Sequence, residues 1–271
     1  EYYLKALELS EDDVFIMSDI AWLYDMTDRY EEALKYLERL EALGQDNAWT
    51  NTEFGYCLSK LGRYEEAIKK LNHALEIEAE NDDKDVSYIY ARLGWCKRKL
   101  NMCDEAIEDF NKAKKWGRND AVINIEIGHC YKAKDEYEEA LKYYLQAEKS
   151  GDTNAMNNLA IMYYKRGKKK EAEEMYIKAA ENGHIGAMNN LGYLYLNEGN
   201  YKEAEKYCTK AIENGHSSGM YNLGAIFEVQ GKYEEAKEWY EKAEKQGMKQ
   251  AKDRLKLFAK AEKEANKEKN S

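Results

Sequence analysis

Apolar residues recur along this chain with the period of an amphipathic helix, and the pattern itself is repeated. The stretches AMNNLA, AMNNLG and GMYNLG begin at residues 155, 187 and 219, so equivalent positions are 32 residues apart both times. A fixed period of this length is typical of helical repeats that stack in a row. The pattern therefore predicts one repeat array, although 271 residues would be long enough for two ordinary domains.

Two alignable positions extend the repeat over most of the chain. An alanine opens the second apolar segment of each unit, at Ala33, Ala67, Ala106, Ala140, Ala172, Ala204 and Ala236. A small residue precedes each of these alanines, at Ala21, Gly55, Gly94, Gly128, Ala160, Gly192 and Gly224. Small residues at both places let two helix backbones approach closely, which predicts a helix-turn-helix unit.

These positions set the expected boundaries. We expect residues 1–13 to be the second helix of a truncated repeat. We expect seven helix pairs over residues 14–247, starting near 14, 48, 87, 121, 153, 185 and 217. Residues 248–271 then form a capping helix and a charged tail, because Met248, Ala251, Leu255 and Phe258 recur at helical spacing.

The chain has no proline, so another residue must end each second helix. Glycine does so in LGQDN, WGRND and the two NGH stretches, which begin at 43, 116, 182 and 214, because glycine adopts the left-handed cap conformation. The segment AENDDKD at 79–85 lengthens one interval to 39 residues and predicts a polar loop between repeats.

Across residues 14–246 the chain resembles the tetratricopeptide repeat (TPR) family. The family's Leu-Gly-Tyr signature is matched by Leu191, Gly192 and Tyr195, and its turn by GRY, GNY and GKY at 62, 199 and 231. The last three units, with KAAENGH and KAIENGH, also resemble Sel-like repeats. The resemblance implies an all-α, right-handed α-solenoid whose first helices line a concave groove that binds proteins or peptides.

An asparagine row is the first candidate site. Asn158, Asn190 and Asn222 lie at the same place in three consecutive units, about 150° from the apolar stripe of their helix. Interior asparagine disfavours a helix, whereas its amide can bond the backbone of an extended peptide. The resemblance implies that role for these three residues. The alternative is that they bond neighbouring helices.

An aromatic row follows the small residue in the earlier units, at Trp22, Tyr56 and Trp95, with His129 at the same place in the next. Arg92, Arg98 and Lys132 accompany it, so the row would suit an apolar or aromatic peptide side chain flanked by acid groups. The alternative is that these rings stack between adjacent units. Only Arg92 has a counterpart in the carboxylate clamp of chaperone-binding relatives, so we do not expect that activity.

Charge and motifs argue against other functions, namely nucleic-acid binding, membrane spanning and catalysis. The net charge of −10 is spread as mixed Glu and Lys, which argues against nucleic acid as a ligand. No apolar run is long enough to span a membrane, and the five cysteines have no CxxC spacing, which is typical of reduced thiols in a cytoplasmic protein. An upstream signal could precede the chain. We find no phosphate-binding loop, nucleophile elbow or metal-ligand spacing, and expect no catalytic residue, metal or cofactor.

The sequence therefore predicts a non-catalytic scaffold that recognises an extended protein or peptide segment in its concave groove. The alternative is a structural spacer or self-assembly module of a larger protein, with homo-oligomers formed through the groove or the ends.

Overall fold

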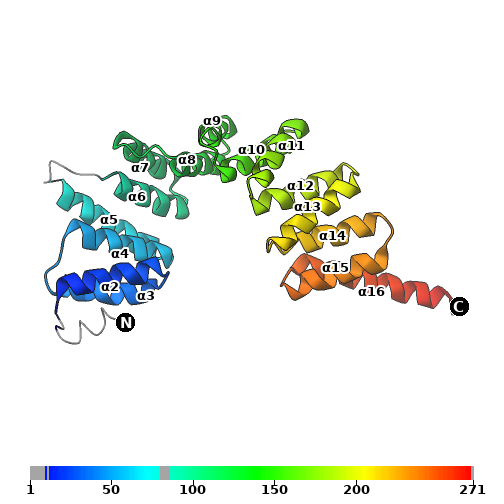
Figure 1. The fold of residues 1–271 in the computed structure, drawn as a ribbon, viewed down its shortest axis with the longest axis horizontal. Helices are drawn as coiled ribbons and strands as arrows, with labels where there is room; N and C mark the ends of the chain where they lie inside the picture. The colour runs from blue at the N-terminus through cyan, green and yellow to red at the C-terminus, as the bar shows by residue number, and fades with distance from the viewer. Residues whose placement is uncertain (1–9, 11, 80–85, 270–271) are drawn as a thin grey trace. The chain divides into compact units, whose positions relative to one another are not determined.

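The computed structural model describes residues 10, 12–79 and 86–269, and within these residues the ordered elements are all helices (Figure 1). The first helices of the pairs are α2 (Val14–Met26), α4 (Ala48–Lys60), α6 (Ser87–Lys99), α8 (Ala121–Ala133), α10 (Thr153–Lys165), α12 (Ile185–Asn197) and α14 (Ser218–Val229). The second helices are α3 (Tyr30–Ala42), α5 (Tyr64–Glu78), α7 (Cys103–Lys115), α9 (Tyr137–Glu148), α11 (Lys169–Glu181), α13 (Tyr201–Glu213) and α15 (Tyr233–Lys245). The predicted all-α solenoid of helical repeats is confirmed.

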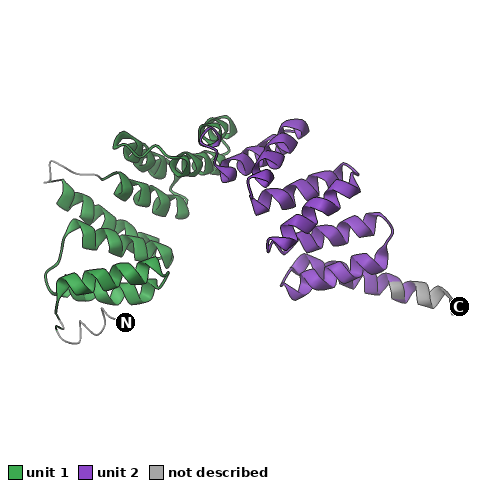
Figure 2. Ribbon diagram, in the orientation of Figure 1, with its two compact units in different colours: residues 1–147 green, residues 148–271 purple. Residues whose placement is uncertain are grey.

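Two compact units divide the chain, residues 1–147 and residues 148–271 (Figure 2). We call them unit 1 and unit 2. The truncated repeat expected at residues 1–13 and the loop expected at 79–85 fall almost entirely outside the described residues.

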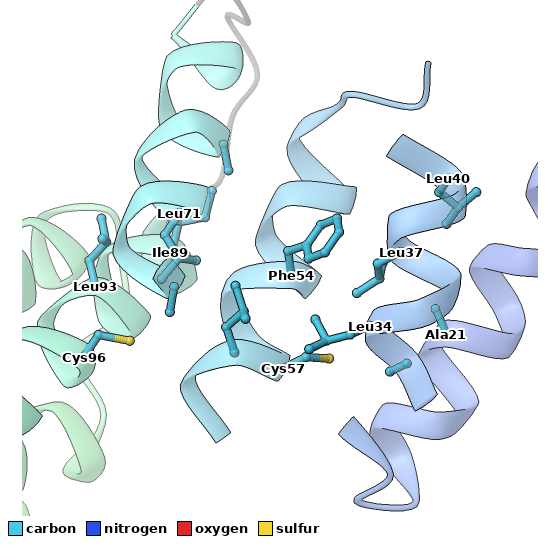
Figure 3. Packing of buried hydrophobic residues seen from close by; sticks show 14 of the residues in the cluster. Ala21, Leu34, Leu37, Leu40, Phe54, Cys57, Leu71, Ile89, Leu93 and Cys96 are labelled. Atoms are coloured by element: carbon cyan, nitrogen blue, oxygen red, sulfur yellow. The ribbon is translucent and has the colours of Figure 1, made fainter. Parts of the chain in front are cut away.

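Each helix pair places a buried apolar side chain from the second helix at the level of the small residue of the first. In unit 1, Leu37, Leu71 and Phe110 are almost completely buried at this place (Figure 3 shows the first two). A Cβ atom added to Gly94 would lie 2.8 Å from the Phe110 ring, so only glycine fits there without a shift. The same apolar stripe continues across neighbouring helices and forms the core of each unit.

The helix ends follow the expected chemistry. The side chains of Asp120 and Asp152 accept hydrogen bonds from backbone N–H groups in the first turns of α8 and α10, and His184 does the same for α12 through Nδ1. Gly183 and Gly215, which end second helices, have φ angles of 83° and 87°, as predicted for left-handed caps.

Helix α16 (Lys249–Lys269) covers the last pair of unit 2. Ala251 is buried against Ala236, Tyr240 and Ala243, and Phe258 packs beside Tyr240. Arg254 forms an ion pair with Glu228 of α14, which also accepts a hydrogen bond from Tyr240. These contacts give the last repeat the neighbour that an interior repeat has.

Candidate binding surface on the first helices

Each first helix turns one face away from its second helix. Relative to the small residue, the positions six before, two before, one after and five after it fall within about 60° on a helical wheel, roughly opposite the packed side. We call this side of each first helix the outward face. The candidate residues lie on it with one exception, because Arg98 is four residues after Gly94.

The outward face has different chemistry in the two units. The position directly after the small residue, where large rings were predicted, holds Trp22, Tyr56, Trp95 and His129 in unit 1, and Ile161, Tyr193 and Ala225 in unit 2. The position two before it is charged in unit 1, with Asp19, Glu53, Arg92 and Glu126, and is the asparagine row in unit 2. The outward face of unit 1 therefore carries rings and charges, whereas that of unit 2 carries amides and a single ring, Tyr193.

A pocket of about 390 Å³ opens on unit 1 between α4, α6 and α8. We call it the unit 1 pocket. It brings together three of the predicted residues, Tyr56, Arg92 and Trp95. The rest of its lining is Ser59, Lys60, Ala91, Phe110, Arg118, Val122, Ile123 and Glu126. Two members of the aromatic row and Arg92 thus belong to one hollow, with α8 as its third wall.

Second helices hold the two rings in place. Tyr30 of α3 makes an edge-on contact with Tyr56, with ring centroids 6.1 Å apart, and Tyr64 of α5 does the same with Trp95 at 5.7 Å. Each contact joins one repeat to the next, which is the stacking role that the sequence left as the alternative. Both indole and phenol remain half-buried and line the pocket, so the two roles coexist.

Arg92 lies over Tyr56, with its Cζ 3.7 Å from the ring centroid. Lys60 also lies over this ring, with its Nζ 5.2 Å from the centroid. Burial raises the pKa of Glu53, while the charge of Arg92 opposes that rise, and the same two causes act on the pKa of Asp25. Arg92 therefore packs against an aromatic ring, and its charge also acts on two partly desolvated carboxyl groups without forming an ion pair with either among the described residues.

Arg98 is placed differently from the prediction, because it points to a carboxylate within unit 1 and is mostly buried. It forms an ion pair with Glu126, and the side chains of the two residues are 21% and 16% exposed. Burial raises the pKa of Glu126, and Arg98 opposes that rise. Arg98 therefore compensates the one carboxylate that lines the pocket.

Trp22 does not line the unit 1 pocket. It lies on α2 and is 49% exposed, on the same stripe as Phe15 and Met26, which are 80% and 62% exposed. Such a run of exposed large apolar side chains on one helix face is typical of an interaction surface.

The asparagines of unit 2 form a ladder between first helices. Asn190 Nδ2 donates to Asn157 Oδ1 at 3.0 Å, and Asn222 Nδ2 donates to Asn189 Oδ1 at 3.0 Å. Asn222 is buried, with 8% exposed. Asn158 is half-buried, and the described part of the chain offers its side chain no hydrogen bond. The helix-to-helix alternative thus describes the contacts of Asn190 and Asn222.

Other pocket residues were missed from the sequence. Glu126 could have been found, because it lies two residues before the small residue of its repeat, the position that Arg92 and the asparagine row hold in theirs. Val122 could also have been found, because it lies six residues before Gly128, the place that Phe15 holds before Ala21, whereas Arg118 carried no such signal because it lies between helices.

Side chains that could bind a metal ion do not gather in the described residues. No cluster of three or more His, Cys, Asp or Glu side chains with metal-site geometry occurs there. The five cysteines are free and buried. In the same described part of the chain, every helix is too short or too polar to cross a membrane.

The repeat geometry agrees with the family comparison. Tetratricopeptide repeat models match residues 46–115 and 184–246, residues 121–150 and residues 153–181. The chain belongs to the tetratricopeptide repeat family, whose fold is a protein-interaction scaffold. The Sel-like character expected for the last units stays a prediction. No curated protein matches the sequence significantly.

Several solved structures share the fold. Pseudomonas aeruginosa PilF aligns with a TM-score of 0.64 at 17% identity, over 79% of this chain and 97% of PilF. The C-terminal part of a TPR repeat-containing protein from Cytophaga hutchinsonii aligns with a TM-score of 0.62 at 16% identity, over 87% and 98%. YrrB, a TPR protein with an unusual peptide-binding site, aligns with a TM-score of 0.51 at 23% identity, over 69% and 96%.

Proposed function

We propose that this protein is a non-catalytic scaffold that binds an extended segment of another protein along the outward face of its first helices. The observation that carries the proposal is the exposure of large apolar side chains on this face of unit 1. Phe15, Trp22 and Val122 are 80%, 49% and 55% exposed in a chain with a mean hydropathy of −0.88. Exposed apolar patches mark interaction sites, and tryptophan is among the residues enriched where protein interfaces concentrate their binding free energy.

The peptide-binding site of YrrB, which shares the fold, supports the same class of ligand. An extended segment advances about 3.3 Å per residue, and packed helices lie about 8 to 10 Å apart. A ligand of about ten residues would therefore cross several first helices and meet one repeat about every third residue.

A second candidate is the spacer or self-assembly module. The asparagine ladder favours this candidate for unit 2, because the side chains of Asn190 and Asn222 each donate a hydrogen bond to the preceding repeat. In that case unit 2 is the structural part, whose asparagine ladder fixes the distance between neighbouring repeats, and only unit 1 binds the ligand.

The test is selection of ligands from a random displayed peptide library on the whole chain, followed by calorimetry with variants. Trp22→Ala and Trp95→Ala should each weaken binding of selected peptides, by about tenfold or more if they act as interface anchors. Tyr201→Ala is the matched control, because Tyr201 is an aromatic residue 37% exposed at the start of a second helix. Selection that yields no peptide, or peptides whose affinity only Tyr201→Ala lowers, would contradict the proposal.

A further inference from the structure

The unit 1 pocket has the chemistry of a specific subsite. We propose that it binds a bulky apolar side chain whose neighbour in the ligand is an acidic side chain, within an internal segment of a protein partner. This inference rests on the proposed function and names what the ligand must carry at one place.

The base of the pocket is apolar. Ala91, Phe110 and Ile123 contribute to its lining and are 8%, 1% and 2% exposed. Its size of about 390 Å³ is within the usual range of ligand pockets, which begins near 300 Å³. A phenyl ring or a branched aliphatic side chain would lie between Tyr56 and Trp95 and remove apolar surface from water.

The rim of the pocket is cationic. Lys60, Arg92 and Arg118 line it, and Glu126 is the one carboxylate among the lining residues. Arg98 already forms an ion pair with Glu126, and Arg118 with Asp120 at 3.1 Å. Neither Lys60 nor Arg92 has a carboxylate within ion-pair distance among the residues that the structure describes. Two cations that form no ion pair among the described residues thus share one pocket, although their charges also act on the nearby Asp25, and that of Arg92 on Glu53.

The position of these cations makes an anion favourable. Both lie over the Tyr56 ring, so their charges are brought close to each other. A carboxylate entering beside Tyr56 would reduce their repulsion and accept charge-assisted hydrogen bonds from Arg92. A lysine or arginine in the ligand would meet the same two charges and be repelled.

A protein segment fits this site better than nucleic acid. Nucleic-acid sites neutralise many phosphates with a stripe of basic side chains, whereas the chain has a net charge of −10 and the pocket has only two cations without an ion-pair partner. The apolar base beside these two cations matches one apolar side chain and one adjacent carboxylate.

The inference is tested with peptides selected from a random library, blocked at both ends so that they have no terminal carboxylate. Their consensus should contain a bulky apolar residue next to Asp or Glu. Changing that acid to its amide should weaken binding to the whole chain about tenfold, and raising the salt concentration should weaken it further.

Lys60→Glu is the main variant, because Lys60 is exposed and forms no ion pair among the described residues; since its charge also acts on the partly desolvated Asp25, folding of the variant is checked by circular dichroism. It should weaken the acidic peptide about tenfold and tighten a peptide with Lys in place of the acid. Lys165→Glu is the matched control, since Lys165 holds the same repeat position on α10 of unit 2 and should change neither affinity. Arg92→Lys keeps the charge beside Glu53 and should lower affinity for the acidic peptide without unfolding the protein.

Two results would overturn the inference while the proposed function stands. One is a consensus without acidic residues, and the other is equal affinity of Lys60→Glu and the unchanged protein for the acidic peptide. Tighter binding of a uridine oligonucleotide than of any selected peptide, lost in Lys60→Glu, would also overturn it. If no peptide is selected at all, the proposed function and this inference fail together.

Discussion

The closest contact in a helix pair of unit 2 makes a sharp test of the repeat packing. A Cβ added to Gly192 of α12 would lie 2.5 Å from Cys208 Sγ, 3.2 Å from Cys208 N and 3.3 Å from Ala204 O. Cys208 and Ala204 are completely buried, so neither can move into solvent. We therefore expect Gly192→Ala to destabilise the protein, although alanine is the better helix former.

The magnitude follows from two opposing effects. Overpacking a buried contact costs about 1 to 3 kcal/mol, while replacing glycine by alanine inside a helix returns about 0.5 to 1 kcal/mol. The net loss should be about 1 kcal/mol. In a Cys208→Ala background the sulfur is gone, and only the contacts near 3.2 Å remain. There Gly192→Ala should stabilise by about 0.5 kcal/mol, because helix propensity then dominates.

The reversal of sign is the measurement. Chemical unfolding followed by circular dichroism on the wild type, both single variants and the double variant gives a coupling free energy, expected at about 1.5 kcal/mol. Ala160→Gly is the matched control, because Ala160 occupies the same repeat position on α10, and the α10–α11 pair already accommodates a Cβ opposite Tyr176. That change should destabilise by about 1 kcal/mol. Equal effects of Gly192→Ala in both backgrounds would refute the assignment of the clash to Cys208.

Three further predictions concern the asparagines, a histidine and the thiols. Asn190→Ala should lower the melting temperature, because it breaks the hydrogen bond to Asn157. Asn158→Ala should leave the melting temperature unchanged or raise it, through a gain of about 0.6 kcal/mol in helix propensity. Equal melting temperatures of the two variants would contradict the ladder. Burial lowers the pKa of His129 to about 4, below its unfolded value, so the unfolded chain binds the extra proton and stability should fall as pH drops from about 6.5 to 4, by at most about 1.4 kcal/mol per pH unit. Comparing urea unfolding of the wild type and His129→Gln across this range checks it, and an equal slope in both proteins would be the contrary result. Burial raises the pKa of the Cys57, Cys96, Cys130 and Cys208 thiols to about 12, so a thiol reagent should react slowly with the native protein. In denaturant without reductant, five thiols should titrate. Fast labelling of the native protein would contradict this prediction.

The pattern of each repeat depends on residues that are near one another in the chain, and the sequence alone determined it. The period, the small residues such as Gly94 and Gly192, and the glycine caps each depend on residues within one helix pair, so their spacing was sufficient to predict an all-α repeat solenoid. The same spacing placed Arg92 and Trp95 on one face of α6 and Tyr56 on the equivalent face of α4, because a helical wheel needs no tertiary information.

Contacts between repeats were decided only by the tertiary structure. The hydrogen bond from Asn190 to Asn157 and the ion pair from Arg98 to Glu126 join residues on different first helices. Whether two such side chains meet depends on how far one repeat is rotated and shifted against the next, and a few tenths of an ångström separate a hydrogen bond from none. The period of a sequence says which positions are equivalent, but the packing of whole helices sets the distances between them.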